Sequence, residues 1–482
     1  MTMKKTLMIV AALFTVSYGA DCLARNVDGY VRSTDGSAIG NVVVSDGVSL
    51  TVTDSDGYYQ LDADEHSRFV FISTPSGYLS AVRPAGEASF YQELTSGKDS
   101  YDFVLRVNPQ DDTRHTIVVT ADPQVMDMED IGLMDVRVGQ MTEDVRSRKE
   151  LKDQYVFGIC LGDIVGADHG LYPEYQRIMD KTGLEFRSVI GNHDMTFDHV
   201  RTYEGSMRKY CDFFGPAWYS FNVGKVHYVV LNDNYYIGRQ WFYMGYFDEL
   251  QLQWLEKDLS YVPEGCKIVV CTHIPTTLTK GDRETFDYPS LASIVANKNS
   301  LYDVLEPYDA LILSGHIHTC TTQNIRPNLT EVNVGGFCGA WWCGDVCIDG
   351  GPAGYKLVSM DETDAEWKYI GCGYPEDYQM KVYVDDANHP DQVIVNVWDY
   401  DDLWKVEYFE NGRKVCDMER FSTRDPHAVD LFRDRSKYKI SWVYAAESLN
   451  FFRAPLSQKA RKIEVRVTDR FGRVYSEKMK LR

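Results

Sequence analysis

Apolar and polar residues alternate differently in three parts of this chain. In the middle, β-branched and apolar runs predict buried strands of a parallel sheet, and longer stretches with helical spacing separate them. The predicted strands are 116–120, 155–161, 186–190, 267–272 and 310–314, and the predicted helices are 130–149, 172–181, 247–259 and 288–295. This alternation of strands and helices predicts a layered α/β domain.

Short strands with alternating apolar residues flank this middle part on both sides. The predicted strands are 42–45, 50–53, 58–61 and 69–73 before it, and 380–384, 392–398, 404–410, 438–443 and 462–469 after it. Turn pairs such as Asp46-Gly47 and Asn411-Gly412 divide them, which is typical of β-sandwiches. We therefore expect an N-terminal β-sandwich at 25–110, an α/β domain at 111–370 and a C-terminal β-sandwich at 371–482.

The first 24 residues have the layout of a secretory signal peptide. Lys4 and Lys5 precede the apolar run Leu7–Val16, and small residues follow it. Asp21 argues against a lipid anchor at Cys22, because lipoprotein signals place a small residue there. No later segment resembles a membrane span, so we expect no transmembrane segment and an exported protein, periplasmic or extracellular.

Charge and cysteine content narrow the possible functions. The formal net charge of −21 argues against a nucleic-acid binder, so an anionic substrate would need local positive charge, which bound metal ions supply. The 11 cysteines do not form the pattern of a small disulfide scaffold in a chain this long. Cys338, Cys343 and Cys347 lie in one loop and could bridge, but they lack the paired Cys-x-x-Cys spacing of a structural zinc site.

Five short motifs follow the predicted strands of the middle part. They are Asp122-Pro123-Gln124, Gly162-Asp163, Gly191-Asn192-His193-Asp194, His273 and Gly315-His316-Ile317-His318. Loops after parallel strands meet at one edge of a sheet, so these polar residues are expected to converge. Carboxylate, amide and imidazole groups together are the ligands of a site for two metal ions.

Each motif residue has an expected place in such a site. Asp163 suits the carboxylate that both ions share. The other ligands divide into Asp122 and His318 for one ion, and Asn192, His273 and His316 for the other. Side chains alternate in direction along a strand, and we expect the loop after the last strand to turn so that both of its histidines reach the metals. Gly315 makes that turn plausible.

In this order the motifs resemble those of the calcineurin-like metallophosphoesterases, over about residues 113 to 365. The resemblance implies a central four-layer α/β/β/α sandwich and two divalent metal ions, Mn, Fe or Zn. It also implies hydrolysis of phosphate esters by metal-bound hydroxide, with His193 as the catalytic residue that protonates the leaving oxygen or stabilises its charge. The flanking regions and the run Phe337–Trp342 are similar to a secreted bacterial subgroup with N-terminal and C-terminal β domains.

Two positions depart from that family's pattern. Gln124 stands where the family usually has histidine; its amide oxygen can still bind metal, so we keep Gln124 as a ligand and leave the metal open. Gly166 stands where the family often has an aspartate that orients the catalytic histidine. Asp168 or Asp194 could take that part, or the pairing is absent.

The substrate is less well defined by the sequence. Trp341 and Trp342 are either core aromatics or a platform for substrate, and Arg239 is either a solvated loop residue or a contact for a phosphate group. A phosphorylated small molecule or glycan is the expected partner, with no nucleic acid.

Further histidines lie outside these motifs, and one alternative function remains. His115, His199, His227 and His389 are interpreted as structural. The alternative function is a non-catalytic glycan- or surface-binding module with a structural metal site. His193 argues against it, because a structural clamp has no need of that residue.

Overall fold

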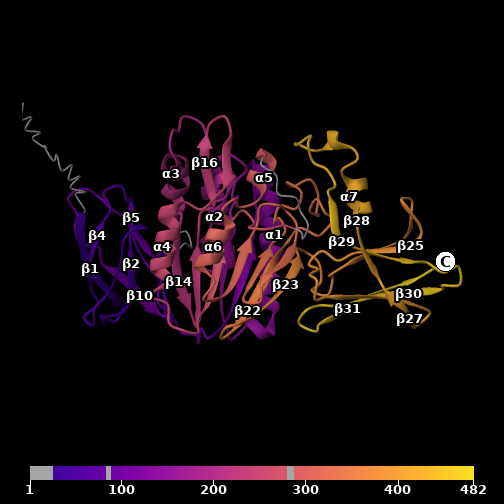
Figure 1. The fold of residues 1–482 in the computed structure, drawn as a ribbon, viewed down its shortest axis with the longest axis horizontal. Helices are drawn as coiled ribbons and strands as arrows, with labels where there is room; N and C mark the ends of the chain where they lie inside the picture. Colours follow the sequence, from indigo (N-terminus) through magenta and orange to yellow (C-terminus); the bar gives the residue numbers. More distant parts are fainter. Residues whose placement is uncertain (1–24, 83–87, 279–286, 482) are drawn as a thin grey trace, which may run out of the picture.

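The protein is an elongated row of three parts (Figure 1), seen in a computed structural model that describes residues 25–82, 88–278 and 287–481. A β-rich region lies at each end, and an α/β domain lies between them. The predicted signal peptide, with Cys22, lies outside the described residues. In the described part of the chain, every helix is too short or too polar to cross a membrane.

The N-terminal region consists of two small sheets. One has the order β4 (Tyr58–Ala63), β1 (Arg25–Ser33), β10 (Phe103–Val107) and β6 (Tyr78–Leu79). The other has the order β3 (Leu50–Val52), β2 (Val43–Ser45), β5 (Phe69–Ile72) and β9 (Tyr91–Glu93), and β7 (Ala81–Val82) pairs with β8 (Ala88–Ser89). Neighbouring strands are antiparallel except for β1 and β10, which run parallel.

The central domain contains two sheets. The first has the order β13 (Phe186–Ser188), β12 (Tyr155–Cys160), β11 (Arg114–Thr120), β22 (Gly354–Asp361) and β23 (Asp364–Gly371). The second has the order β14 (Tyr219–Val223), β15 (Val226–Val230), β18 (Lys267–Cys271), β19 (Asp309–Ser314), β21 (Leu329–Asn333) and β20 (Thr321–Arg326). Parallel pairing holds for β11 to β13 and for β15, β18, β19 and β21.

Helices cover the outer faces of these two sheets. They are α1 (Met128–Ser147), α2 (Tyr172–Met179), α3 (Tyr203–Phe214), α4 (Glu249–Leu259) and α6 (Lys298–Val304), whereas α5 (Tyr288–Ser293) lies beside residues 242–245. Ile117 and Ile159 of the first sheet share a core with Val270 of the second, whereas the alternate residues Val118 and Cys160 pack with α1 and α2. The predicted four-layer α/β/β/α sandwich is thus confirmed.

Short 3₁₀ turns and a hairpin complete the central domain. The turns are η1 (Lys149–Leu151), η2 (His169–Leu171), η3 (Asp180–Thr182) and η4 (Asn192–Asp194), and the hairpin is β16 (Asn234–Gly238) with β17 (Phe242–Gly245).

The C-terminal region is again built from two antiparallel four-stranded sheets. Their orders are β24 (Lys381–Asp386), β25 (His389–Asn396), β29 (Glu447–Pro455), β28 (Glu419–Arg424), and β27 (Arg413–Asp417), β26 (Lys405–Glu410), β30 (Lys462–Thr468), β31 (Val474–Lys480). Apolar residues of both sheets, among them Val395 and Val465, form one core. Between β28 and β29 lie α7 (Pro426–Leu431) and η5 (Arg435–Lys437).

One sequence expectation about local structure is wrong, and one possibility that the sequence left open is not realised. The predicted strand 438–443 is a loop, because Ile440 and Val443 are buried against Ala340 and Val346 of the central domain instead of facing a sheet partner. The cysteines of the loop 338–347 do not bridge: every described cysteine is a free thiol.

Candidate metal centre

The loops after β11 and β12 bring two carboxylates together inside the protein. The amide of Asp122 donates to the carbonyl of Gly162 at 3.1 Å, and the amide of Gln124 donates to the carbonyl of Asp163 at 2.8 Å. Both aspartate side chains are almost completely buried. Burial of two carboxylates side by side is costly unless positive charge compensates it.

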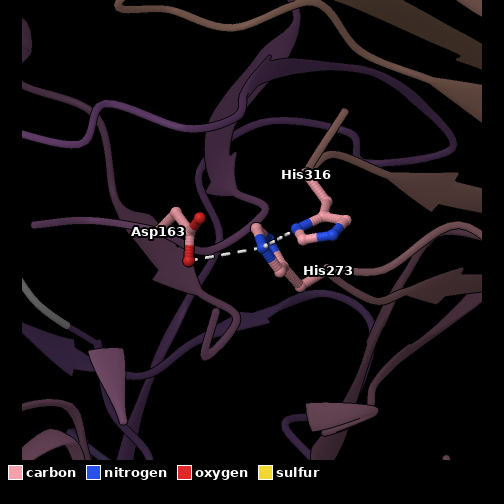
Figure 2. A group of neighbouring side chains, drawn as sticks. All are labelled: Asp163, His273 and His316. Atoms are coloured by element: carbon pink, nitrogen blue, oxygen red, sulfur yellow. Dashed lines mark hydrogen bonds and ion pairs between the residues drawn. The ribbon is translucent and has the colours of Figure 1, made fainter. Parts of the chain in front are cut away.

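The second sheet supplies that compensation. In Figure 2, His273 lies between Asp163 and His316. His273 follows β18, and His316 follows β19. Nε2 of His273 lies 3.3 Å from Oδ1 of Asp163 and 3.2 Å from Nδ1 of His316. One ligand atom from each of these residues can be chosen so that all three lie within 4.8 Å of one another. The sequence predicted one sheet edge, but the residues converge from the carboxyl ends of strands in two sheets.

Each of the three predicted histidine ligands is held by a main-chain carbonyl. Nδ1 of His273 lies 2.7 Å from the carbonyl of Leu161, Nε2 of His316 lies 2.9 Å from that of Ala292, and Nδ1 of His318 lies 2.8 Å from that of Gly339. A carbonyl only accepts, so that nitrogen carries the proton and the opposite nitrogen keeps a lone pair. This is how proteins orient imidazoles toward a metal.

Two buried oxygens near these lone pairs have no hydrogen-bond partner. They are Oδ1 of Asp122 and Oε1 of Gln124. Nε2 of Gln124 donates to Oδ2 of Asp163 at 2.8 Å, so Oε1 of Gln124 is left free. Nε2 of His318 lies 3.5 Å from the free oxygen of Asp122. Unpartnered buried acceptors beside imidazole lone pairs fit bound cations.

Asn192 joins the same cluster from the loop after β13. Its Oδ1 lies 3.1 Å from Nε2 of His273. All seven predicted metal ligands therefore lie on loops that meet at this cluster, and their donor atoms are carboxylate, amide or imidazole groups.

The electrostatics of the cluster favour a cation. Burial lowers the pKa of His316 to about 3 and that of His318 to about 4, so both rings are neutral, as ligands must be. Burial also lowers the pKa of His273, but the charge of Asp163 outweighs it and raises that pKa to about 10. Burial raises the pKa of Asp122 well above its usual value. A bound cation would replace the proton that Asp163 holds on His273.

The backbone is strained where these side chains attach. The residues with left-handed φ include Asp122 (52°), Gln124 (39°), Asp163 (52°), His316 (72°) and His318 (53°). Such strain clusters at functional sites. The two histidines thus make the turn themselves. Gly315 instead lets the backbone pack closely against Asp122, because a Cβ at this position would lie 2.9 Å from Oδ2 of Asp122.

His193 lies at the edge of the cluster and is held by the backbone. Its amide donates to Oδ1 of Asp163 at 2.8 Å, and its Nδ1 lies 2.5 Å from the carbonyl of Gly166. The residue that replaces the family's aspartate therefore contacts the ring through its main chain. Asp168 instead accepts the amide of Gly170, and Asp194 accepts the hydroxyl of Tyr172.

Two residues near the site were not singled out from the sequence. Asp233 is buried and accepts the hydroxyl of Thr272 and the amide of Ile274, on both sides of His273. Burial raises its pKa to about 7. Its place shortly after the apolar strand β15 was an available signal. The ring of Tyr243 stands edge-on to His316 at 6.3 Å, and no local motif marked it.

The predicted substrate residues differ in their surroundings. Trp342 is buried and donates its indole N–H to the carbonyl of Pro123 at 3.0 Å, so it belongs to the packed core. Trp341 is half-buried with its ring 4.6 Å from that of His318. Arg239 is exposed and pairs with Asp198 at 3.2 Å.

The histidines interpreted as structural lie elsewhere. His115 and His227 are buried and hydrogen-bonded to Tyr228 and Asp258, respectively. His389 contacts Asp386, and His199 is exposed.

Comparison with known families gives three consecutive matches. Residues 25–108 match the N terminal of Calcineurin-like phosphoesterase, residues 115–320 match Calcineurin-like phosphoesterase, and residues 331–475 match the C terminal of Calcineurin-like phosphoesterase. No curated protein matches the chain.

Solved structures similar to this chain are distant in sequence. A dimetal phosphatase from Danio rerio is 16% identical, with 53% of this chain and 96% of that chain covered and a TM-score of 0.38. The purple acid phosphatase PPD1 from yellow lupin is 12% identical, with 68% and 67% covered and a TM-score of 0.37. A 5'-nucleotidase from Candida albicans is 13% identical, with 55% and 53% covered and a TM-score of 0.32.

Proposed function

We propose that this chain, which belongs to the calcineurin-like metallophosphoesterases and carries their N-terminal and C-terminal regions, hydrolyses phosphate esters with two divalent metal ions. The observation that carries the proposal is the set of imidazoles, each tied to a carbonyl through one nitrogen. The other nitrogen faces Asp163 in His273, Asp122 in His318 and the ring of His273 in His316. One ion would have Asp122, Gln124, Asp163 and His318 as ligands, and the other would have Asp163, Asn192, His273 and His316.

The side chains around the ions have separate tasks. When bound, the ions supply charge that stabilises the phosphoryl oxygens and lower the pKa of water enough to attack at neutral pH. Asp163 would be the ligand that both ions share. Its Oδ1 also accepts the amide of His193, which keeps that residue at the site. His193 would act from its doubly protonated form: Nδ1 keeps its proton on the Gly166 carbonyl, and Nε2 would give the second proton to the leaving oxygen. The Gly166 carbonyl orients the ring but, unlike a carboxylate, carries no full negative charge.

Substrate and location extend the proposal. We infer a phosphorylated small molecule or glycan as substrate. We also infer export, as in the secreted bacterial subgroup, because residues 1–24 have the charge pattern of a signal peptide. Expression of the full chain and mass spectrometry of the mature protein would reveal cleavage near residue 24 if the export signal is used.

The test compares Asp163→Asn with the wild type. Protein purified without metal is loaded with manganese, iron or zinc, its metal content is measured, and aryl phosphate monoesters and diesters are assayed. Because Asp163 is the shared ligand, we expect lower metal content and a loss of turnover of more than about 100-fold, beyond what loss of an outer-shell partner costs.

Asp168→Asn is the matched control. Asp168 is an exposed aspartate on the same loop, and its side chain caps η2. We expect this variant to keep its metal and its turnover. Unchanged metal content and turnover in Asp163→Asn would contradict the proposal.

A further inference from the structure

An arm of the C-terminal region reaches back to the metal centre. We define the arm as residues 425–446, between β28 and β29. Its buried residues Ala428, Phe432, Ile440 and Val443 share one apolar cluster with the loop 340–348, which follows the last predicted ligand. The amide of Ala446 donates to the carbonyl of Ile348 at 2.8 Å. The arm is therefore packed onto that loop.

A charged contact also fixes the arm to α1, the helix that follows the Asp122-Pro123-Gln124 motif. Nζ of Lys439 lies 2.8 Å from Asp127, the N-cap of α1, and 2.9 Å from the buried Asp130. Apolar packing and ion pairs at separate points hold the arm in one place, which is required if it is to position a side chain for binding.

The arm carries Trp442 to the metal centre. The side chain is 51% exposed, and its ring stands at 74° to that of Trp341 with the centroids 4.3 Å apart. The ring of Trp341 in turn lies 4.6 Å from that of His318. Three rings thus form a row from a predicted metal ligand to an exposed tryptophan.

Backbone strain shows that Trp341 is held in its position. Trp341 and Trp342 have φ of 50° and 61°, a region that bulky residues rarely adopt. Trp342 anchors the loop: its indole donates to Pro123, and the guanidinium of Arg137 lies over its ring at 4.5 Å. The strained pair places one indole in the core and the other beside His318, and such strain persists where function requires it.

Aromatic residues also lie on the His316 side of the centre. Tyr243 of β17 stands edge-on to His316, and the neighbouring Trp241 and Phe242 are 57% and 45% exposed. Large exposed apolar side chains next to a polar centre are typical of ligand-binding surfaces. Rings therefore lie on the His316 side as well as on the His318 side of the centre.

We propose that Trp442, together with Trp341, is a specificity-determining residue that stacks on a ring of the leaving group. The inference rests on the proposed function and names its substrate class: phosphate esters whose alcohol part contains a ring with an apolar face. Both a pyranose and a nucleoside have such a face, and aromatic side chains bind it by stacking.

The experiment compares three esters on the metal-loaded full chain: glucose 6-phosphate, AMP and the acyclic glycerol 3-phosphate. For Trp442→Ala we expect the KM of the ring esters to rise about tenfold, with kcat unchanged, because stacking on one aromatic side chain contributes that much. The KM of glycerol 3-phosphate should stay unchanged. A rise for glucose 6-phosphate alone identifies a pyranose, and a rise for AMP alone identifies a nucleoside.

Two further variants separate stacking from other effects. Trp442→Phe keeps an aromatic face and should restore most of the affinity for the ring esters. Leu403→Ala removes another exposed apolar side chain of the C-terminal region and should change no KM. Equal melting temperatures of the variants would show that the arm remains folded, which the exposure of Trp442 leads us to expect.

A binding measurement decides the role of Trp442 independently of turnover. Tryptophan fluorescence titrated with glucose and with adenosine should respond in the wild type and lose the response in Trp442→Ala. The inference is overturned if Trp442→Ala raises the KM of glycerol 3-phosphate equally, or if it changes neither KM nor fluorescence. If the wild type hydrolyses neither these esters nor the aryl phosphates, the proposed function fails, while the fluorescence titration still decides the role of Trp442.

Discussion

The two β-rich regions hold the central domain from opposite ends (Figure 1), and they differ in what they bring to the metal centre. The N-terminal region packs beside α4 and β14, where Trp254 donates to Ser45 at 3.0 Å and Ser220 to Ser73 at 3.0 Å. The C-terminal region packs beside the loops that follow β19 and β21. Its arm places Trp442 against Trp341, the residue that neighbours His318. A similar architecture thus supports the fold at one end and shapes the site at the other.

The chemistry of the two interfaces differs as well. Lys356 of β22 and Asp399 of the C-terminal region form an ion pair at 2.7 Å, with side chains 0% and 2% exposed. The N-terminal interface instead uses hydrogen bonds, a contact of the buried Arg187 guanidinium with the Phe90 ring and the partly exposed pair of Arg68 with Asp212. A region that must hold an arm in position is fixed by contacts that are costly to break.

The largest effect is expected from Lys356→Ala. The change leaves the buried carboxylate of Asp399 without its partner and should lower the free energy of unfolding by about 3 to 5 kcal/mol, measured by urea titration. The double variant Lys356→Met with Asp399→Leu should recover most of this loss, because it removes both charges. A loss of less than about 1 kcal/mol would contradict the view that this buried pair holds the interface.

The second-largest effect is expected from acid at His115, beside the segment that joins the N-terminal region to the central domain. Burial lowers the pKa of His115 to about 4, and its Nδ1 lies 2.8 Å from the carbonyl of Asp112, whose carboxylate accepts the amide of Gly77. The unfolded chain binds this proton near pH 6.5, so stability is complete above that pH and is lost as the pH falls toward 4. We expect a loss of about 3 kcal/mol, and His115→Phe should flatten this part of the stability profile.

The smallest effects are expected at the N-terminal interface. Ser45→Ala leaves the buried indole N–H of Trp254 without its acceptor and should cost about 1 to 3 kcal/mol in unfolding free energy, with every KM unchanged. Arg68→Ala removes the partly exposed ion pairs with Asp212 and Glu93 and should cost about 1 kcal/mol or less. A change in KM for the ring esters in either variant would mean that this region also shapes the site.

Much of the fold followed from periodicity. The predicted central strands coincide with β11, β12, β13, β18 and β19 to within two residues at each end, because buried parallel strands are continuous apolar runs. The helices α3, α6 and α7 were not predicted. The segment 438–443 alternates like a strand, but its apolar residues pack on a loop of another domain, and one-dimensional pattern cannot distinguish these cases.

For the candidate site, the motifs alone specify which side chains are available: carboxylates, amides and imidazoles, each placed directly after a strand. How these side chains meet follows from the folded arrangement of the chain. Two sheets contribute ligands, left-handed backbone aims Asp163 and His318, and a carbonyl of Gly166 replaces the family's carboxylate at His193. Trp442 reaches the site from a separate domain. Residue types and spacing are local properties, whereas side-chain direction and contacts between distant loops are set by packing of the whole chain.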